Sequence, residues 1–149
     1  PVNIPSGADF TIDGWFYLTA AQADFRMIMG ESTGGSGQYY CISSTGILFQ
    51  TGATSGTQAS FAYTFSQNTW YHIAISRYGN NIYCFVNGNS VAGTNTSQSA
   101  AFLTGTSYIG VGYSSSYPWN GYMQDFRITK GYARYVQNFT PPTQADQLY

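Results

Sequence analysis

Trp119-Asn120-Gly121-Tyr122-Met123-Gln124-Asp125-Phe126-Arg127-Ile128 is the stretch that decides the fold of this 149-residue chain. An aromatic residue, followed two positions later by glycine, leads into a strand that ends in Asp-Phe-Arg-Ile. Residues two apart on a strand share a face, so we expect Asp125 and Arg127 to pair with each other or with backbone groups. A short turn with a second arginine follows. The apolar side chains of the stretch are expected in the core: Trp119, Phe126 and Ile128.

Outward from this stretch, the chain reads as short strands separated by polar loops, with no helical pattern of three turns. Gly-containing connections, such as Asn87-Gly88, are typical of tight hairpin turns. This spacing predicts an all-β fold, a two-sheet antiparallel jelly-roll sandwich. We expect one domain over residues 1–142, with 143–149 as a tail or the start of a linker. The expected strands are 10–18, 25–29, 39–43, 47–50, 61–65, 70–77, 82–86, 91–92, 107–111 and 121–129.

The composition is uncharged and aromatic. Charged residues make up 7% of the chain and aromatic residues 18%, with 14 Tyr, and the net charge is −1. A typical globular protein is about 25% charged. Electrostatic attraction therefore does not favour nucleic acid, and no apolar run is long enough to insert into a membrane. Chains rich in Tyr, Ser, Gly and Asn form adaptable binding surfaces, although any all-β protein also collects Tyr on its strands.

Four stretches, in order, resemble laminin-G-like modules of the concanavalin A-like superfamily. They are Phe10–Phe16, Thr69–Asn80 with its Trp-x-His-hydrophobic-Ala pattern, Ile82–Gly88 with its Val-Asn-Gly turn, and the closing strand quoted above. The resemblance implies a jelly-roll sandwich, in a superfamily that contains both sugar-binding or adhesive modules and glucanases. A closing segment like 126–135 is also similar to those of phage virion and marine microbial proteins.

The acidic residues do not form the pair that a glucanase needs. Glu31 is the one glutamate, and no second acid lies two to four residues away. Asp9 and Asp13 are about 13 Å apart on an extended segment, beyond the 6.5–9.5 Å of inverting glycosidases. We expect both to be strand-edge or turn residues. His72, the one histidine, alternates with Ile73 and Ile75 and is expected to be a packed, hydrogen-bonded structural residue. We therefore predict that the chain is not an enzyme.

Sugar recognition requires aromatic faces and a few fixed polar groups. The loop from Gly112 to Asn120 offers both without charge, and Pro118 stiffens it. Its candidate ligand-binding residues are Tyr113, Tyr117 and Asn120, ahead of Trp119, whose position in the resembled family packs into the core. A second candidate is the polar hairpin that contains Tyr78 and Asn80.

Two cysteines, Cys41 and Cys84, lie in strand-like runs. They are either buried free thiols or a disulfide between neighbouring strands, and spacing alone leaves both open. The resemblance also implies calcium as a candidate cofactor, because many laminin-G-like modules hold it at the sandwich rim. Calcium takes six to eight oxygen ligands, and the sequence contains no compact acidic loop that would supply them.

The sequence thus favours a non-catalytic recognition or adhesion module. The expected partner is carbohydrate or a surface glycan, in an extracellular or virion-surface assembly, where display in many copies would add avidity. The alternative is a structural role as a virion decoration, tail-fibre or self-assembling surface protein, in which the aromatic residues contact other copies or other chains. A glycoside hydrolase is a distant third. The chain begins with Pro1, so we expect it to be a processed product or a fragment of a longer protein.

Overall fold

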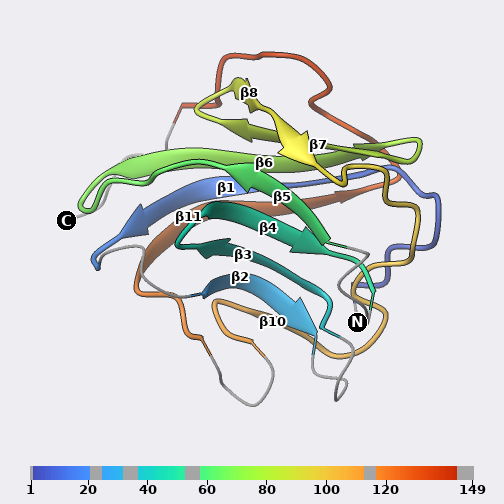
Figure 1. Ribbon diagram of the computed structural model, residues 1–149, viewed down its shortest axis with the longest axis horizontal. Coiled ribbons are helices and arrows are strands. Elements are labelled where there is room, and N and C mark those ends of the chain that lie inside the picture. Colours follow the sequence, from blue (N-terminus) through green and yellow to red (C-terminus); the bar gives the residue numbers. More distant parts are fainter. Residues whose placement is uncertain (1, 21–24, 32–36, 53–57, 113–116, 144–149) are drawn as a thin grey trace.

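The computed structural model describes residues 2–20, 25–31, 37–52, 58–112 and 117–143. They form two antiparallel sheets packed face to face (Figure 1), in the order β11-β1-β6-β7-β8 and β10-β2-β3-β4-β5-β9. The all-β jelly-roll prediction is confirmed. These residues contain no helix that is long and apolar enough to cross a membrane.

The strand boundaries follow the sequence prediction closely. The five-stranded sheet contains β11 (Gly121–Lys130), β1 (Phe10–Leu18), β6 (Trp70–Tyr78), β7 (Asn81–Val86) and β8 (Asn89–Val91). The six-stranded sheet contains β10 (Ser107–Ile109), β2 (Arg26–Glu31), β3 (Tyr39–Ser43), β4 (Gly46–Gln50), β5 (Gln58–Ala62) and β9 (Gly93–Thr94).

Strand β5 departs from the prediction of 61–65. It begins at Gln58 and pairs with β4 through Ala62, whereas Tyr63 and Phe65 leave the ladder and pack their rings against Tyr71. The sequence did not indicate this start because polar residues begin the strand. A strand near the edge of a sheet needs apolar residues on one face only.

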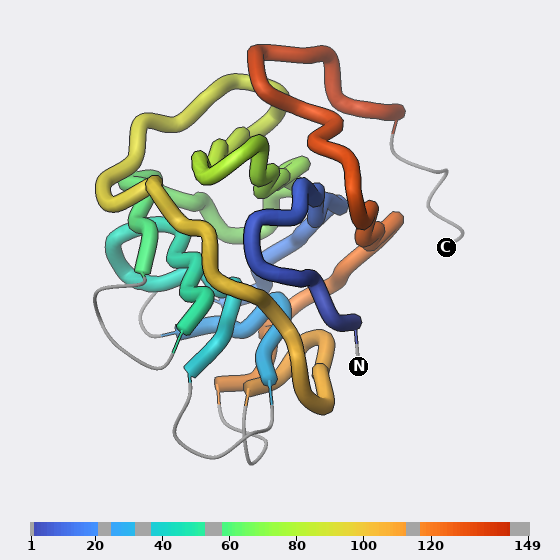
Figure 2. The backbone as a smooth tube through the Cα atoms, turned by 90° about the vertical axis from the view of Figure 1, so that its right-hand side faces the viewer, coloured from blue at the N-terminus to red at the C-terminus, as the bar shows by residue number. Residues whose placement is uncertain are grey.

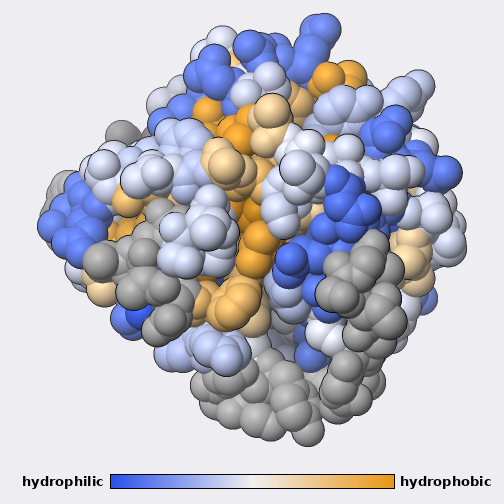
Figure 3. Space-filling model, viewed as in Figure 1, coloured by the Kyte–Doolittle hydropathy of each residue, from blue (hydrophilic) through white to orange (hydrophobic). Residues whose placement is uncertain are grey.

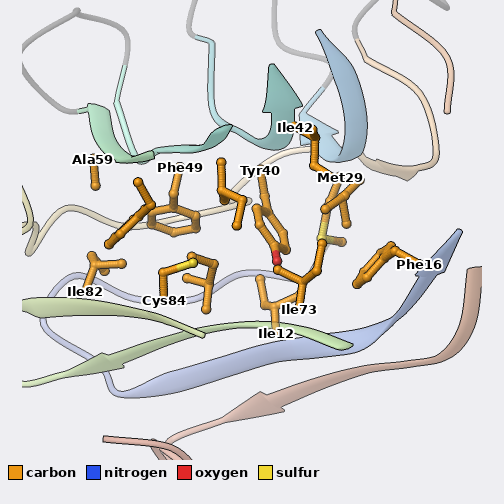
Figure 4. Packing of buried hydrophobic residues seen from close by; sticks show 14 of the residues in the cluster. Ile12, Phe16, Met29, Tyr40, Ile42, Phe49, Ala59, Ile73, Ile82 and Cys84 are labelled. Atoms are coloured by element: carbon orange, nitrogen blue, oxygen red, sulfur yellow. The ribbon is translucent and has the colours of Figure 1, made fainter. Parts of the chain in front are cut away.

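Apolar side chains at alternate positions of the strands fill the space between the two sheets. Side chains two residues apart point to the same face, so Phe10, Ile12 and Phe16 of β1 all point inward. Figure 4 shows Phe16, Ile12 and Ile73 from one sheet facing Tyr40, Phe49 and Met29 from the other. Trp119, Phe126 and Ile128 pack against this core while staying partly exposed, as the closing strand predicted.

The two cysteines lie in different layers. Cys84 belongs to the core between the sheets, whereas Cys41 packs with Met27 and Leu48 in a separate apolar cluster. Both are free thiols, which decides the alternative that the sequence left open. Burial raises the pKa of each thiol, so neither is a reactive nucleophile.

A β-bulge in β11 lies directly beside the position where Arg127 pairs with Asp13 of β1. Asp13 pairs with Arg127 and Trp15 with Gln124, so Gly14 alone faces two residues of β11. One of them, Asp125, has a φ of 52°, which interrupts the alternation of the strand. The predicted Asp125–Arg127 pair is therefore wrong, because Arg127 binds Asp13 instead.

The C-terminal segment, residues 131–143, lies over the outer face of the five-stranded sheet. Figure 2 shows it on the side of β1 and β11 that faces away from the six-stranded sheet. The Arg134 amide donates to Thr11 Oγ1 (2.8 Å), and the Phe139 amide donates to the Gly88 carbonyl (2.9 Å). The Tyr135 and Phe139 rings stack 3.6 Å apart and pack on Phe85. The fold therefore buries part of a sheet face that the strand pattern alone leaves open.

Candidate functional site

Three aromatic side chains form a row across the uncovered part of the same sheet face. On β1, Tyr17 alternates with the buried Phe16 and Leu18 and so points outward. The register places Tyr17 opposite Trp70 of β6 on one side and opposite Tyr122 of β11 on the other. The ring centroids of Tyr17 lie 5.3 Å from Trp70 and 5.7 Å from Tyr122, at interplanar angles of 54° and 48°. We call these three residues the aromatic trio.

The aromatic trio combines one exposed and two partly exposed residues with uncharged polar neighbours. Tyr122 is 63% exposed, and Tyr17 and Trp70 are partly exposed. The Tyr17 hydroxyl donates to Asn68 Oδ1 at 3.4 Å, and the exposed Asn120 lies two residues before Tyr122. Aromatic faces beside amide groups can bind a neutral, hydroxyl-bearing ligand, with the rings contacting apolar faces and the amides fixing the orientation.

Gly121 fixes the entry of β11 into this row. Its φ is +146°, and a Cβ on it would lie 1.7 Å from the Tyr17 carbonyl oxygen. The close approach of the two backbones thus requires glycine. This explains the Trp-Asn-Gly entry of the closing strand, and it sets Tyr122 directly beside Tyr17.

A buried charged cluster lies farther along the face, under the C-terminal segment. Arg127 donates from Nε to Asp13 Oδ1 (3.1 Å) and from a terminal nitrogen to Oδ2 (2.7 Å), and also to the Tyr135 hydroxyl (3.1 Å). Burial alone would raise the pKa of Asp13, but its contacts with His72 and Arg127 outweigh burial and hold that pKa below its ordinary value. Asp13 is 1% exposed, so the expectation of a strand-edge or turn residue is wrong.

His72 is packed as predicted, but its ring is not hydrogen-bonded in the part of the chain that the structure describes. Its Nε2 lies 3.4 Å from Asp13 Oδ2, a long electrostatic contact, and both ring nitrogens are buried without a hydrogen-bond partner. The rings of Trp15 and Phe139 pack edgewise against it, at 5.4 and 5.6 Å between centroids. The indole nitrogen of Trp15 is likewise buried and unpartnered.

A cavity of about 490 Å³ lies against this cluster. This volume falls within the range of about 300–1,000 Å³ that is usual for small-molecule sites. We call it the strap cavity, because the end of the C-terminal segment forms one wall. Its lining residues come from β1, β6, β11 and that segment: Asp13, Gly14, Trp15, His72, Asp125, Phe126, Arg127, Pro142 and Thr143.

The predicted loop residues do not form one patch. Tyr117 is 47% exposed and packs edgewise on Phe25, and its carbonyl accepts from the Met27 amide at the six-stranded sheet. The Asn120 carbonyl instead accepts from the Thr19 amide, beside the five-stranded sheet. Between them, Trp119 packs against Phe16 at the end of the core. Residues 117–120 thus pass from one sheet to the other, and of the described candidates among them Asn120 lies next to the trio.

The second predicted hairpin lies at the other end of the sandwich. Tyr78 (59% exposed) and the exposed Asn80 follow Arg77, which pairs with Phe10, whereas Gly121 pairs with Leu18. The two ends of β1 are eight residues apart, about 26 Å at 3.3 Å per residue. The two predicted sites are therefore separate surfaces. Tyr113, the remaining candidate, lies outside the described residues.

Sequence reasoning missed the aromatic trio, although the alternation of Trp15-Phe16-Tyr17-Leu18 already placed Tyr17 outward. What the sequence lacked was the register that brings in Trp70 and Tyr122, more than 50 residues away.

The described acids are bound to the fold. Glu31 is 5% exposed and accepts from the Thr104 amide at 3.0 Å, and Asp9 accepts from the Gly79 amide at 2.8 Å. Across the described ranges, no group of three or more His, Cys, Asp or Glu side chains could hold a metal ion. These acids do not fit a calcium cage built from carboxylates, and calcium binding stays a prediction.

An apolar groove follows the open edge of the sandwich. Two adjoining hollows of about 490 and 170 Å³ share Phe61 and Ala92, between β7–β8 and β5. Figure 3 shows an apolar band down the same side of the molecule. Val136 of the C-terminal segment, 44% exposed, also lines the groove.

Comparison with known proteins agrees with this architecture. Residues 1–134 match the model of the concanavalin A-like lectin/glucanases superfamily. A structure from Bacteroides ovatus, described as a candidate carbohydrate-binding protein, is 21% identical with a TM-score of 0.63, over 85% of this chain and 40% of that one. Domains LG4-5 of the mouse laminin alpha1 chain are 17% identical with a TM-score of 0.60, over 92% of this chain and 41% of that one.

The heptameric SAP-like pentraxin from Limulus polyphemus is 15% identical with a TM-score of 0.56, over 85% of this chain and 65% of that one. The chain thus spans less than two thirds of the length of each of these three structures. At such identities the likeness concerns the fold. No curated protein matches the sequence.

Proposed function

Because the chain belongs to the concanavalin A-like lectin/glucanase superfamily, we propose that it is a non-catalytic recognition module that binds carbohydrate through the aromatic trio. The observation that carries this proposal is the row formed by Tyr17, Trp70 and Tyr122 on the outer sheet face, beside uncharged polar residues. Folded proteins usually bury large aromatic side chains, so a row of one exposed and two partly exposed rings supports a binding surface here.

The positions of the acids support binding rather than catalysis. A glycosidase needs two carboxyl groups about 5–10 Å apart that both reach the substrate. Here Asp13 is tied to Arg127, and Glu31 is held by Thr104 at the end of β2 in the other sheet. Neither is free to act as an acid or a nucleophile.

We place the module in an extracellular or virion-surface assembly. Chains with about 7% charge and exposed tyrosines suit shallow, neutral recognition, in which single sites are weak. Display in many copies would then raise the overall affinity.

The test is a glycan array probed with the wild type, Tyr122→Ala and Tyr132→Ala. Tyr122 and Tyr132 are both 63% exposed, so the two variants remove equal amounts of exposed ring from different places. We expect binding by the wild type and Tyr132→Ala, and loss of signal in Tyr122→Ala. Absence of glycan binding by all three proteins would refute the proposal.

A second candidate function is contact with other protein chains, favoured by the apolar groove along β7, β8 and β5. In that case the chain would self-associate through its open edge as a virion decoration, tail-fibre or surface protein. Sedimentation of the wild type and Val136→Ser tests it. A concentration-dependent dimer that Val136→Ser weakens would support this function, and a monomer at about 100 μM would refute it.

A further inference from the structure

We propose that Asn120 is a site of spontaneous deamidation, which turns the neutral surface beside the aromatic trio acidic as the protein ages. Asn-Gly pairs occur twice in the chain, as Asn87-Gly88 and Asn120-Gly121. The fold holds the first pair in place and leaves the second open to reaction. The reaction consumes water and needs no ligand, so it does not depend on the proposed function.

Deamidation of an Asn-Gly pair is an internal acyl transfer. The backbone nitrogen of glycine attacks Cγ of the asparagine side chain and loses its proton, and the side-chain amine leaves as ammonia. Water then opens the resulting succinimide at either carbonyl group, which gives aspartate or isoaspartate. Glycine favours the first step because it has no Cβ to hinder the approach of the two groups. The step therefore requires a side-chain amide that can turn and a backbone nitrogen outside the hydrogen-bonded ladder.

Asn120 meets the first requirement. It is exposed at the entry to β11, and its backbone carbonyl accepts from the Thr19 amide at 3.0 Å. Its side-chain amide has no hydrogen-bond partner among the described residues. No contact that the structure shows must therefore break before Cγ of Asn120 turns toward the nitrogen of Gly121.

The backbone nitrogen of Gly121 meets the second requirement. Residue pairs in an antiparallel ladder alternate between hydrogen-bonded and non-hydrogen-bonded. Gly121 pairs with Leu18, and the bond from the Thr19 amide to the Asn120 carbonyl joins the two residues just beyond this pair. The pair is thus the non-hydrogen-bonded kind, and the Gly121 N–H points away from β1. Since β11 is the edge strand of its sheet, no other described strand lies on that side.

The Asn87-Gly88 pair is held at both residues. Asn87 is also exposed, but its Oδ1 accepts from the His72 amide (2.9 Å), and its own amide donates to the His72 carbonyl (2.8 Å). Gly88 is buried, and its carbonyl accepts from the Phe139 amide (2.9 Å). The Asn87 side chain must release His72 before its Cγ can react. The fold therefore slows deamidation at this pair.

The products change the surface beside the trio. Aspartate adds a negative charge two residues before Tyr122, and isoaspartate also adds one carbon to the main chain. A Cβ on Gly121 would lie 1.7 Å from the Tyr17 carbonyl oxygen, so the two backbones already touch where β11 begins. We expect the longer main chain to pull the Asn120 carbonyl away from the Thr19 amide and to displace the start of β11.

The first test is incubation of the whole folded chain at mildly alkaline pH, with peptide mass spectrometry that follows Asn120 and Asn87 separately. The matched control is the same chain in guanidinium chloride, where both pairs are accessible and should react at similar rates. In the folded chain, Asn120 should react at least about fivefold faster than Asn87, the factor that one ordinary hydrogen bond provides. Equal rates at the two sites of the folded chain would overturn the proposal. So would an intact Asn120 after a time that converts it in the unfolded chain.

The second test compares aged wild type with Asn120→Gln by ion exchange. Glutamine must close a larger ring, so we expect the first acidic fraction from the wild type alone. The isoaspartate form in that fraction should melt at a lower temperature than freshly purified Asn120→Asp, which carries the charge on an ordinary main chain. The same acidic fraction from Asn120→Gln would contradict the assignment to Asn120, and equal melting temperatures would contradict the displacement of β11.

Discussion

The buried pair of Asp13 and Arg127 makes the sharpest prediction about stability. In Asp13→Asn, the side chain keeps its shape but loses the charge that two Arg127 hydrogen bonds use. Breaking a buried ion pair costs about 3–5 kcal/mol. The side chain of Arg127 is 40% exposed and can turn toward water, so we expect a smaller loss than this range, about 2–3 kcal/mol.

Urea unfolding followed by tryptophan fluorescence measures this loss. The matched control is Asp9→Asn, four residues earlier, where the carboxylate accepts one exposed backbone hydrogen bond and the expected loss is below about 1.5 kcal/mol. Equal losses in the two variants would show that the Asp13–Arg127 pair does not stabilise the fold in the way we argue.

The Asp13–Arg127 pair also makes the stability of the fold depend on pH under acidic conditions. A carboxyl group whose folded pKa lies below its unfolded value contributes stability above the unfolded value and loses it as the pH falls through the folded pKa. The pKa of Asp13 is held below its ordinary 3.8, against the effect of burial, by His72 and Arg127. We therefore expect wild-type stability to drop as the pH falls below about 4, and Asp13→Asn to drop less over that range. Parallel curves would contradict this assignment.

Three further predictions concern single contacts. Arg77 is fully buried and donates to the carbonyls of Ala8, Ala100 and Pro5 at 2.6–2.7 Å. Arg77→Met should therefore lower the free energy of unfolding, measured in urea, by about 3 kcal/mol. A decrease of less than about 1 kcal/mol would contradict the role of these hydrogen bonds in holding the three segments together. Gly121→Ala should lower the melting temperature more than Gly131→Ala. Gly131 also has a positive φ, but nothing lies within 4 Å of the Cβ that the substitution adds. Thermal melts of the two variants test this difference. Cys41 and Cys84 should react with a thiol reagent such as Ellman's only on unfolding, and rapid reaction of the native protein would show that one of them is accessible.

The strand pattern predicted the two sheets because alternation and turn residues are local signals. It correctly assigned Trp119 and Phe126 to packing against the core. It misread Asp13 as a peripheral acid, because its partner Arg127 lies 114 residues away and only the register of β1 against β11 sets them opposite each other. A strand sequence shows which face a residue takes, but not what covers that face.

The site was harder to predict for the same reason. A loop that contains Tyr117 and Trp119 is conspicuous in the sequence, yet its residues are divided between two sheets and the core. The aromatic trio is assembled by register across three strands, and the strap cavity depends on the docking of residues 131–143. Both are long-range consequences of packing.

The central claim is that the aromatic trio binds carbohydrate, and the most direct test is the dissociation constant of the glycan selected on the array. Isothermal titration would compare the wild type, Tyr122→Ala and Tyr132→Ala at equal concentration. Loss of one aromatic contact of about 1.4 kcal/mol or more corresponds to at least tenfold weaker binding. We predict that loss for Tyr122→Ala and less than a twofold change for Tyr132→Ala. Unchanged affinity of Tyr122→Ala would contradict the claim.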